Sequence, residues 1–470
     1  MSDQRTSLRV GLLVAAAPIL SSGVAFAQSS KAAKEASSSE VATPGSRIGF
    51  ALSGYVQADA VAFRQSSQDE LNPTTGEPLN EARFTIPRAR LRADVSSLQG
   101  APRSDETALF VRGALELDGN TLQGPAMRLV EAHASLGLQG PDATVPFSLG
   151  EQGMVTALPY AELTVGLFKI PFGVEGPERE RSRLFLERSA VTRALVPGNY
   201  DLGARLMGGY GPVRYALAVM NGEPVGEGFF PGRDPNGAKD ILGRLGIDAH
   251  PHAKLHVRAG FSGLSGKGFH RGTPSTKDTL VWRDDNEDGL VQQTEIRVIA
   301  GSSATASQNF DRFALAADLR VDGELPVLGT LSVFGEVVRA QNLDRAFLIA
   351  DPIAMGRDVR ERGFYVAATQ DLTRWAQVGV RYDHYDPDVD ASETIAAARV
   401  PRDVSTSALA VTAAFRFTPS RWTFAKNHPF PALRLIGEYD RRKNALGRTP
   451  GGYPTTLADD AFAVRAEVSF

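Results

Sequence analysis

The last ten residues, Ala461 to Phe470, read AFAVRAEVSF, and this stretch decides the fold. Apolar residues occupy every second position, and charged or small polar residues occupy most of the positions between them. Successive side chains of a β-strand point to opposite faces, so a period of two predicts a strand with one apolar and one polar face. Ten residues is also about the length of a tilted strand that crosses a membrane.

The same alternation recurs along the chain, for example in FTIPRARLRADV (84–95), ALFVRGALELD (108–118) and DRFALAADLRV (311–321). Soluble sandwiches also alternate, but their strands average nearer 5–6 residues. The repeated longer segments predict an all-β transmembrane antiparallel barrel of about 16 strands with long external loops. We expect strands near 49–65, 81–96, 106–118, 128–138, 160–169, 200–210, 212–221, 237–249, 253–264, 308–321, 328–340, 360–371, 373–385, 402–417, 431–444 and 457–470.

The two ends of such a sheet have to meet. In lipid, an open strand edge leaves backbone N–H and C=O groups without partners, at a cost of several kcal/mol each. We therefore expect the first and last strands to pair.

The N-terminus predicts export. Arg5 and Arg9 precede an apolar run, 10–20, and Ala25-Phe26-Ala27 has the small-x-small pattern of a cleavage site. A buried helix of a cytosolic domain would not need these three elements in this order. We expect a signal peptide over 1–27, a polar disordered periplasmic leader over 28–45, and an outer-membrane barrel over 46–470.

Composition excludes several kinds of site. The chain of 470 residues contains no cysteine, which rules out thiolate zinc sites and cysteine nucleophiles. Its net charge is −3, and removing two cations and one anion with residues 1–27 leaves −4, so nucleic acid is not an expected partner.

The connections between predicted strands alternate between tight turns and long loops, as in outer-membrane barrels. Two connections, 139–159 and 418–430, are longer than this rule expects on their side. The third long connection, 170–199, contains PERERSRLFLERSAVTR and is a candidate constriction loop. The alternative is a solvated helical turn at the barrel mouth.

Three arginines form a ladder on one strand. Arg88, Arg90 and Arg92 alternate along its polar face, so their positions are about 6.6–7 Å apart. Such a ladder attracts small anions inside a pore. An equally weighted alternative pairs these arginines with carboxylates on neighbouring strands and gives them only a structural role. The complete set of predicted pore-lining residues is Arg88, Arg90, Arg92, Arg112, Arg179, Arg181 and Arg183.

The segment 284–295 reads DDNEDGLVQQTE and has the spacing of an EF-hand calcium loop. Its flanks look like strand or loop rather than helix, and the connection 265–307 that contains it is expected to be external. The predicted calcium ligands are Asp284, Asn286, Asp288, the carbonyl of Leu290, and Glu295. The alternative is an acidic solvated loop tip.

An enzymatic function is the alternative suggested by His133 and Ser135, which lie two residues apart beside Glu131. A serine needs an adjacent base to become a nucleophile, and this spacing provides one. The pair resembles the His-x-Ser of calcium-dependent outer-membrane phospholipases, but Leu136-Gly137 replaces their Asn-Gly. We therefore expect a wall histidine rather than an enzyme. A structural or adhesive barrel is the other alternative.

Several motifs resemble the phosphate-selective porin O and P family of bacterial outer-membrane porins. They are GYVQADAVAF (54–63), FTIPRARLRAD (84–94), VGLFKIPFGVE (165–175), FLERSAVTRALVPG (185–198), YDLGARLMG (200–208) and YALAVMNGE (215–223). The resemblance implies a trimeric barrel in contact with outer-membrane lipid and lipopolysaccharide that passes anions, including phosphate-like oxyanions. The chain departs from the family in lacking a run of lysines for a phosphate-binding cluster. A general porin with a preference for anions is the resulting prediction.

Overall fold

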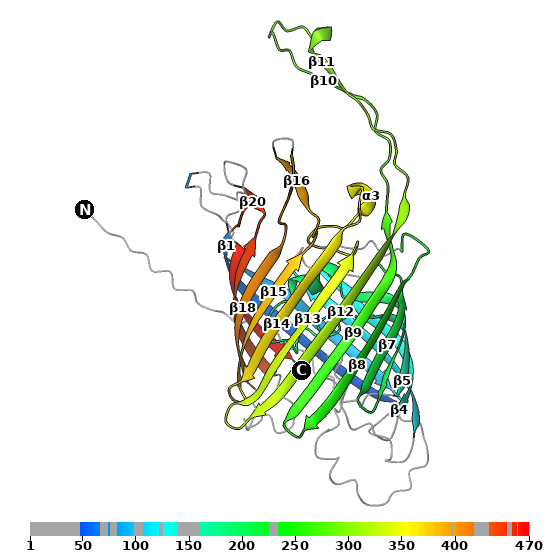
Figure 1. Cartoon of the computed structure of the whole chain (residues 1–470), viewed down its shortest axis with the longest axis vertical. Helices are drawn as coiled ribbons and strands as arrows, with labels where there is room; N and C mark the ends of the chain where they lie inside the picture. The colour runs from blue at the N-terminus through cyan, green and yellow to red at the C-terminus, as the bar shows by residue number, and fades with distance from the viewer. Residues whose placement is uncertain are drawn as a thin grey trace, which may run out of the picture. The chain divides into compact units, whose positions relative to one another are not determined.

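The computed structural model describes residues 48–65, 74–75, 82–97, 107–121, 126–139, 160–224, 234–395, 398–417, 432–448, 454–457 and 459–469. Strands from these residues join edge to edge, each antiparallel to its neighbours, in one closed barrel of 16 strands (Figure 1). The predicted fold class is therefore confirmed.

The barrel strands, in order around the sheet, are β1 (Gly49–Gln65), β2 (Ala82–Ser96), β3 (Ala108–Asn120), β4 (Ala126–Gln139), β5 (Ala161–Lys169), β6 (Tyr200–Tyr210), β7 (Val213–Met220), β8 (Asp240–His252), β9 (Leu255–His270), β12 (Gln308–Leu325), β13 (Gly329–Gln341), β14 (Arg360–Asp371), β15 (Ala376–Asp386), β18 (Thr406–Phe417), β19 (Ala432–Asn444) and β22 (Asp459–Ser469). Each predicted segment corresponds to one of these strands, with its ends displaced by four residues or fewer except at the end of β9, which extends to His270 and not to 264.

The sheet closes where the first and last strands pair. The register runs from Tyr55 opposite Ser469 to Gln65 opposite Asp459. Closure leaves neither strand with an open edge, as the cost of unpaired backbone groups in lipid requires.

Side chains of β22 show why an alternating sequence forms this wall. Phe462, Val464 and Val468 point outward and are 40–50% exposed, whereas Arg465 and Glu467 point inward and are 2% and 4% exposed. The outer face is apolar, so it suits a lipid environment. The inner face carries charges that need partners, and these partners come from neighbouring strands and from a loop inside the barrel.

The long connections carry short elements of their own. Three two-stranded hairpins are described: β10 (Thr279–Trp282) with β11 (Ile296–Ile299), β16 (Ser392–Ile395) with β17 (Ala398–Pro401), and β20 (Gly447–Arg448) with β21 (Pro454–Thr455). The helices are α2 (Ala190–Leu195), α3 (Pro352–Met355) and the 3₁₀ turn η1 (Gln293–Glu295). Within the described part of the chain, no helix has the length and apolarity that crossing a membrane requires.

The two ends of the barrel differ. We call the end from which β10 and β11 project the long-loop end and the other, where β8 turns directly into β9, the short-turn end (Figure 1). The predicted signal peptide (1–27), the leader (28–45), the terminal Phe470 and the over-long connections (139–159 and 418–430) fall almost entirely outside the described residues.

Candidate functional site

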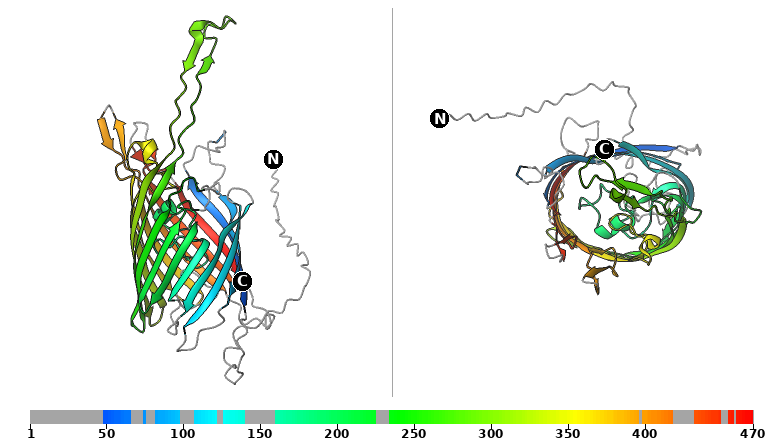
Figure 2. Two further views of the ribbon diagram at one scale, coloured as in Figure 1. Left: turned by 90° about the vertical axis from the view of Figure 1, so that its right-hand side faces the viewer. Right: turned by 90° about the horizontal axis from the view of Figure 1, so that it is seen from above.

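The connection between β5 and β6, residues 170–199, lies inside the barrel, as the view from above shows (Figure 2). Most of its side chains are buried. It carries α2, which begins after Ser189, and the Ser189 hydroxyl accepts a hydrogen bond from the Thr192 N–H at 3.4 Å. This cap satisfies one of the backbone donors that the first turn of a helix leaves without a partner. We call residues 170–199 the inner loop.

Glycines of the wall make room for the apolar part of the inner loop. A side chain at Gly379 would place its Cβ 2.6 Å from Leu184 and 3.2 Å from Phe185. At Gly363 the Cβ would lie 2.8 Å from the Val191 Cβ. Both are closer than carbon atoms approach in proteins, so these positions accept the loop only because they have no side chain.

Polar groups hold the inner loop on several sides of the barrel. On one side the N–H of Gly173 donates to Ser262 Oγ of β9 at 3.2 Å, and the N–H of Val174 donates to Glu336 Oε2 of β13 at 3.1 Å. Farther round the wall, arginines of β15, β19 and β22 donate to loop carbonyl oxygens: Arg381 to Glu187 at 2.8 Å, Arg434 to Arg181 at 3.0 Å, and Arg465 to Leu186 at 3.0 Å. The loop therefore crosses the lumen and narrows it.

The arginine ladder of β2 faces inward and is engaged by carboxylates. Arg90 and Arg92 are only 7% and 4% exposed. The ion pairs are Arg88 with Glu187 (3.2 Å), Arg90 with Glu116 (3.0 Å), Glu180 (2.9 Å) and Asp118 (3.5 Å), and Arg92 with Asp94 (2.8 Å), Glu116 (3.1 Å) and Glu131 (2.5 Å). The structural alternative expected three of these partners, Asp94, Glu116 and Asp118, of which Asp94 lies on β2 itself. Glu131 of β4 and two carboxylates of the inner loop complete the set. Two of the three arginines are thus enclosed between wall and loop.

The other predicted arginines are distributed over the wall and the inner loop. Arg112 lies 3.7 Å from Glu162 and over the ring of Phe110, and Arg179 lies 3.9 Å from Glu116. Arg181 contributes its carbonyl oxygen to the contact with Arg434 described above. Arg183 is buried 4.0 Å from Glu180. Burial, with the nearby charge of Arg188, lowers the pKa of Arg183 to about 10.

Glu180 is the centre of this network. Its Oε2 atom lies 2.9 Å from Arg90 and 3.4 Å from Lys169, and its Oε1 atom lies 2.6 Å from Arg188. Burial raises the pKa of the Glu180 carboxyl, but the cations of Arg90, Lys169, Arg188 and Arg183 outweigh burial. The net pKa of Glu180 lies well below its usual range.

A partly open cavity of about 300 Å³ remains between the inner loop and the wall that includes β7, β8, β9 and β12. Glu175 and Glu178 line it from the loop. The charged and titratable residues that line it from the wall are Arg214, Arg244, Asp248, His256, Arg258, Asp318 and Arg320. This cavity lies directly between the inner loop and the charged inner face of the wall, and we treat it as the candidate constriction.

The cations of this cavity pair with carboxylates in two different ways. Arg244 forms two hydrogen bonds with Asp318, at 2.6 and 3.0 Å. Arg258 and Arg320 instead share one carboxylate, that of Asp322, at 2.7 and 2.9 Å. Their side chains are 31% and 28% exposed. Arg258 and Arg320 thus place two guanidiniums beside one carboxylate at a water-accessible point of the wall, while the carboxylates of Glu175, Glu178, Asp248 and Asp318 line other parts of the cavity.

The predicted calcium loop lies at the turn between β10 and β11, away from the barrel wall (Figure 1). Its oxygens already organise the turn: Asp284 accepts from the N–H groups of Asp288 (3.2 Å) and Gly289 (2.8 Å), and Asp288 accepts from the Leu290 N–H (2.8 Å). Asn286 Oδ1 accepts from the Asp288 N–H at 3.1 Å, and Glu295 accepts from the N–H groups of Asp285 (3.1 Å) and Gln292 (3.0 Å). Gly289 has φ +79°, a conformation that glycine adopts without strain. The five predicted ligand residues thus share one turn, flanked by strands.

Glu131, His133 and Ser135 also lie in line on β4. His133 Nε2 is 2.9 Å from Glu131 Oε1, and His133 Nδ1 is 3.4 Å from Ser135 Oγ. Ser135 is 4% exposed, and its hydroxyl also bonds Thr164 at 2.9 Å. Glu131 is engaged by Arg92. The serine therefore has no exposed face for an ester substrate, and the three side chains belong to the inward-facing polar network of the wall.

Sequence reasoning missed the cavity residues of β7, β8, β9 and β12. The alternation of DRFALAADLRV (311–321) places Arg320 on the charged face of its strand, and the same parity argument applies to Arg244 and Arg258. What the sequence does not reveal is which inward-facing cations remain accessible, since that depends on the side of the lumen that the inner loop covers.

No family model matches the chain, and no curated protein matches it in sequence. Similar solved structures include OmpT of Vibrio cholerae in its trimer form (10% identity, 90% of this chain and 99% of that chain covered, TM-score 0.48). The outer membrane channel DcaP of Acinetobacter baumannii has 12% identity, with 90% and 97% covered and a TM-score of 0.48. An anion-selective porin from Comamonas acidovorans has 11% identity, with 90% and 100% covered and a TM-score of 0.48. The register of this chain itself establishes a closed antiparallel barrel of 16 strands.

Proposed function

We propose that this protein is an outer-membrane porin that lets small hydrophilic solutes diffuse passively and prefers anions. The observation that carries the preference is the pair Arg258 and Arg320, which share the carboxylate of Asp322 beside the cavity of about 300 Å³. In a narrow space lined by low-dielectric walls, the local charge decides which ions enter, and the small net charge of the chain does not.

The apolar outer face and the charged inner face support the membrane setting of this proposal. A barrel with lipid outside and water inside needs this distribution, whereas a soluble barrel would expose the opposite one. Export to the outer membrane and contact with lipid and lipopolysaccharide remain part of the proposal. So does a homotrimer, which rests on the motif resemblance and is checked by the mass of the unheated complex.

Among anions, phosphate-like oxyanions are the class that the arginines of the cavity are best suited to bind. A guanidinium has paired N–H donors that can bind two oxygens of one oxyanion at once. Chloride is a single atom and cannot form this two-point contact. We therefore include phosphate and sulfate, without assigning phosphate specificity, because the cavity is lined by arginines and the family's lysine cluster is missing.

The test is the reversal potential of the purified protein in planar bilayers across a potassium chloride gradient. We expect channels with a linear current–voltage relation. Their reversal potential should have the sign expected for a pore that passes chloride more readily than potassium. A potential of the opposite sign contradicts the preference but keeps the channel. If folded, heat-modifiable protein produces no conductance in the bilayers, the channel proposal itself is contradicted.

We further propose that residues 284–295 bind one calcium ion and so order the β10–β11 hairpin. The support is the number of oxygen donors gathered in one turn, because calcium takes oxygen ligands at about 2.3–2.6 Å and does not require flanking helices. We expect a weak site of roughly 10⁻⁴–10⁻³ M, as in extracellular modules.

Calorimetric titration of the wild type and of the double variant Asp284→Ala, Glu295→Ala tests the calcium site. Heat from the wild type that is absent in the variant supports it. Equal heats from both proteins show that this turn binds no calcium.

A further inference from the structure

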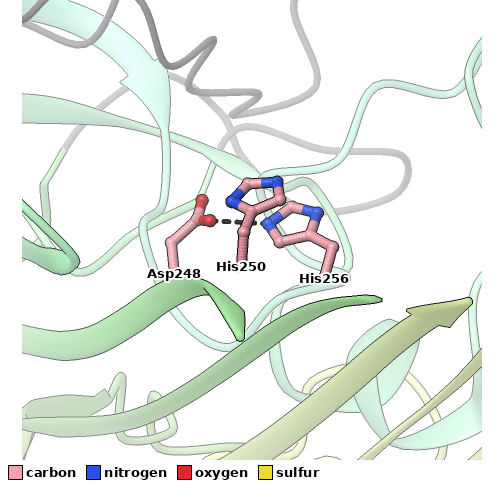
Figure 3. A group of neighbouring side chains, drawn as sticks. All are labelled: Asp248, His250 and His256. Atoms are coloured by element: carbon pink, nitrogen blue, oxygen red, sulfur yellow. Dashed lines mark hydrogen bonds and ion pairs between the residues drawn. The ribbon is translucent and has the colours of Figure 1, made fainter. Parts of the chain in front are cut away.

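Two histidines and an aspartate meet at the short-turn end of the barrel, on the hairpin between β8 and β9 (Figure 3). Asp248 and His250 lie two apart on β8, so they share a face. The register pairs Ala249 with Val257, so His256 of β9 stands opposite His250 and diagonal to Asp248, and the register shifts only beyond them, where His252 pairs with Leu255. One ligand-capable atom from each of the three side chains lies within 4.8 Å of the others.

The three side chains already interact. His256 Nε2 lies 2.6 Å from Asp248 Oδ1, and the imidazole rings of His250 and His256 stack with centroids 4.1 Å apart and planes 7° apart. Two imidazole nitrogens and one carboxylate oxygen form a donor set that suits zinc and neighbouring transition metals. Calcium and magnesium prefer sites made entirely of oxygen.

We propose that Asp248, His250 and His256 bind a divalent transition-metal ion, with Zn²⁺ as the reference ion. Tetrahedral zinc with bonds of about 2.0–2.2 Å needs ligand atoms about 3.3 Å apart, and the three ligand atoms here already lie within 4.8 Å of one another. His250 is exposed, so its ring is free to turn toward the other two ligands. The metal takes the place of the proton shared by Asp248 and His256, and water completes its fourth position.

The charges around the site allow this substitution. Asp322 Oδ2 lies 3.7 Å from His256 Nδ1 and adds a second carboxylate. Arg214 lies 3.8 Å from Asp248 and opposes a cation, but it also donates to the carbonyl oxygen of Val213 at 3.0 Å. Arg258 is held by Asp322 at 2.7 Å. Asp322 thus neutralises Arg258, and Arg214 is the one of these two cations that a metal on Asp248 would face directly.

The position of the site gives metal binding a consequence. Asp248 and His256 line the same cavity as Arg258 and Arg320. A bound dication would add positive charge at the short-turn end of the proposed solute path, and it would replace a hydrogen bond between β8 and β9 with metal bonds. The expected effect is a shift of the reversal potential toward stronger anion preference when zinc is present.

The direct test is equilibrium dialysis of tag-free folded protein against ZnCl₂, with excess calcium and magnesium present to occupy oxygen-only sites. The proposal expects one zinc per chain for the wild type and at least a ten-fold weaker affinity for the double variant His250→Ala, His256→Ala. His252→Ala is the matched control, because His252 belongs to the same turn but not to the three-residue cluster, and it should bind like the wild type.

Cobalt(II) gives an independent readout, since imidazole coordination produces visible absorption bands that the double variant should lose. Heat-modifiability on gels shows whether each variant is folded. Stoichiometric zinc in the double variant, or none in the wild type, overturns the proposal and leaves Asp248 and His256 as a strand-to-strand contact. Dialysis requires no conduction, so failure here is distinguishable from failure of the channel proposal.

Discussion

The guanidinium of Arg465 on the last strand donates two hydrogen bonds of 2.7 Å each to the carboxylate of Asp59 on the first strand. The pair lies on the inner face of the seam that closes the barrel, and Arg465 is 2% exposed. Bidentate arginine–carboxylate pairs combine strength with fixed geometry. Arg465 also holds the inner loop through the carbonyl oxygen of Leu186 at 3.0 Å.

Replacing this arginine should weaken the closure. Arg465→Ala leaves Asp59 buried without its partner, and breaking a buried pair in this way costs about 3–5 kcal/mol. We expect the folded band on unheated gels to convert to the unfolded band at a clearly lower temperature. Arg283→Ala, at an exposed position beside the calcium-type turn, is the control. If both variants convert at the wild-type temperature, the pair contributes nothing to closure.

Loosening the inner loop should widen the path. Arg381→Ala with Arg434→Ala removes two wall donors to loop carbonyl oxygens, at 2.8 and 3.0 Å. We expect larger and noisier single-channel conductance, because the loop then samples positions away from the wall. Arg362→Ala serves as the control, since its side chain is 66% exposed at the end of β14. Unchanged conductance in the double variant would mean that the loop does not set the width.

Selectivity should follow the accessible arginines and not the enclosed ones. Neutralising Arg258 and Arg320 as Arg→Gln should shift the reversal potential toward cations, with the anion-to-cation permeability ratio falling by roughly two-fold or more. Arg90→Gln should chiefly lower stability, because Arg90 is enclosed by Glu116 and Glu180. The opposite pattern, with selectivity lost only in Arg90→Gln, would restore the ladder of β2 as the selectivity element.

Acid should act on the inner loop through Glu180. Its folded-state pKa lies well below the ordinary value of about 4.3, so its contribution to stability is complete above that pH and is lost as the pH falls through the folded pKa. Thermal unfolding measured between pH 7 and pH 2 should show a wild-type transition that drops only in strong acid. Glu180→Gln should be less stable at pH 7 and change less on acidification, whereas Glu324→Gln, at an exposed position, should match the wild type.

The line of Glu131, His133 and Ser135 should be structural. Ser135→Ala removes the hydroxyl that bonds Thr164 at 2.9 Å, and we expect a loss of stability of about 1 kcal/mol. Hydrolysis of a p-nitrophenyl ester should stay at the background rate in both proteins. Wild-type hydrolysis that disappears in Ser135→Ala would revive the phospholipase-like alternative.

The barrel was predictable from the sequence because the period of two is local. Phe462, Val464 and Val468 alternate with inward-facing charges. Each strand with this pattern can be predicted from its own residues, without knowledge of its neighbours. The candidate site was less predictable, because it depends on contacts between distant parts of the chain. Arg90 meets Glu180 only because the inner loop lies against β2, and His250 meets His256 only because the register of β8 with β9, which pairs Ala249 with Val257, places them opposite each other.

The bonds of Arg465 also impose an order on assembly. Asp59 and Arg465 are 406 residues apart, so their contact forms only after every intervening strand is available, and closing so long a segment is entropically slow. Because the same guanidinium binds the carbonyl oxygen of Leu186, the last strand completes its bonds only when the inner loop is already in place. Sealing of the cylinder and placement of the loop in its interior are thus coupled, because one guanidinium completes both contacts.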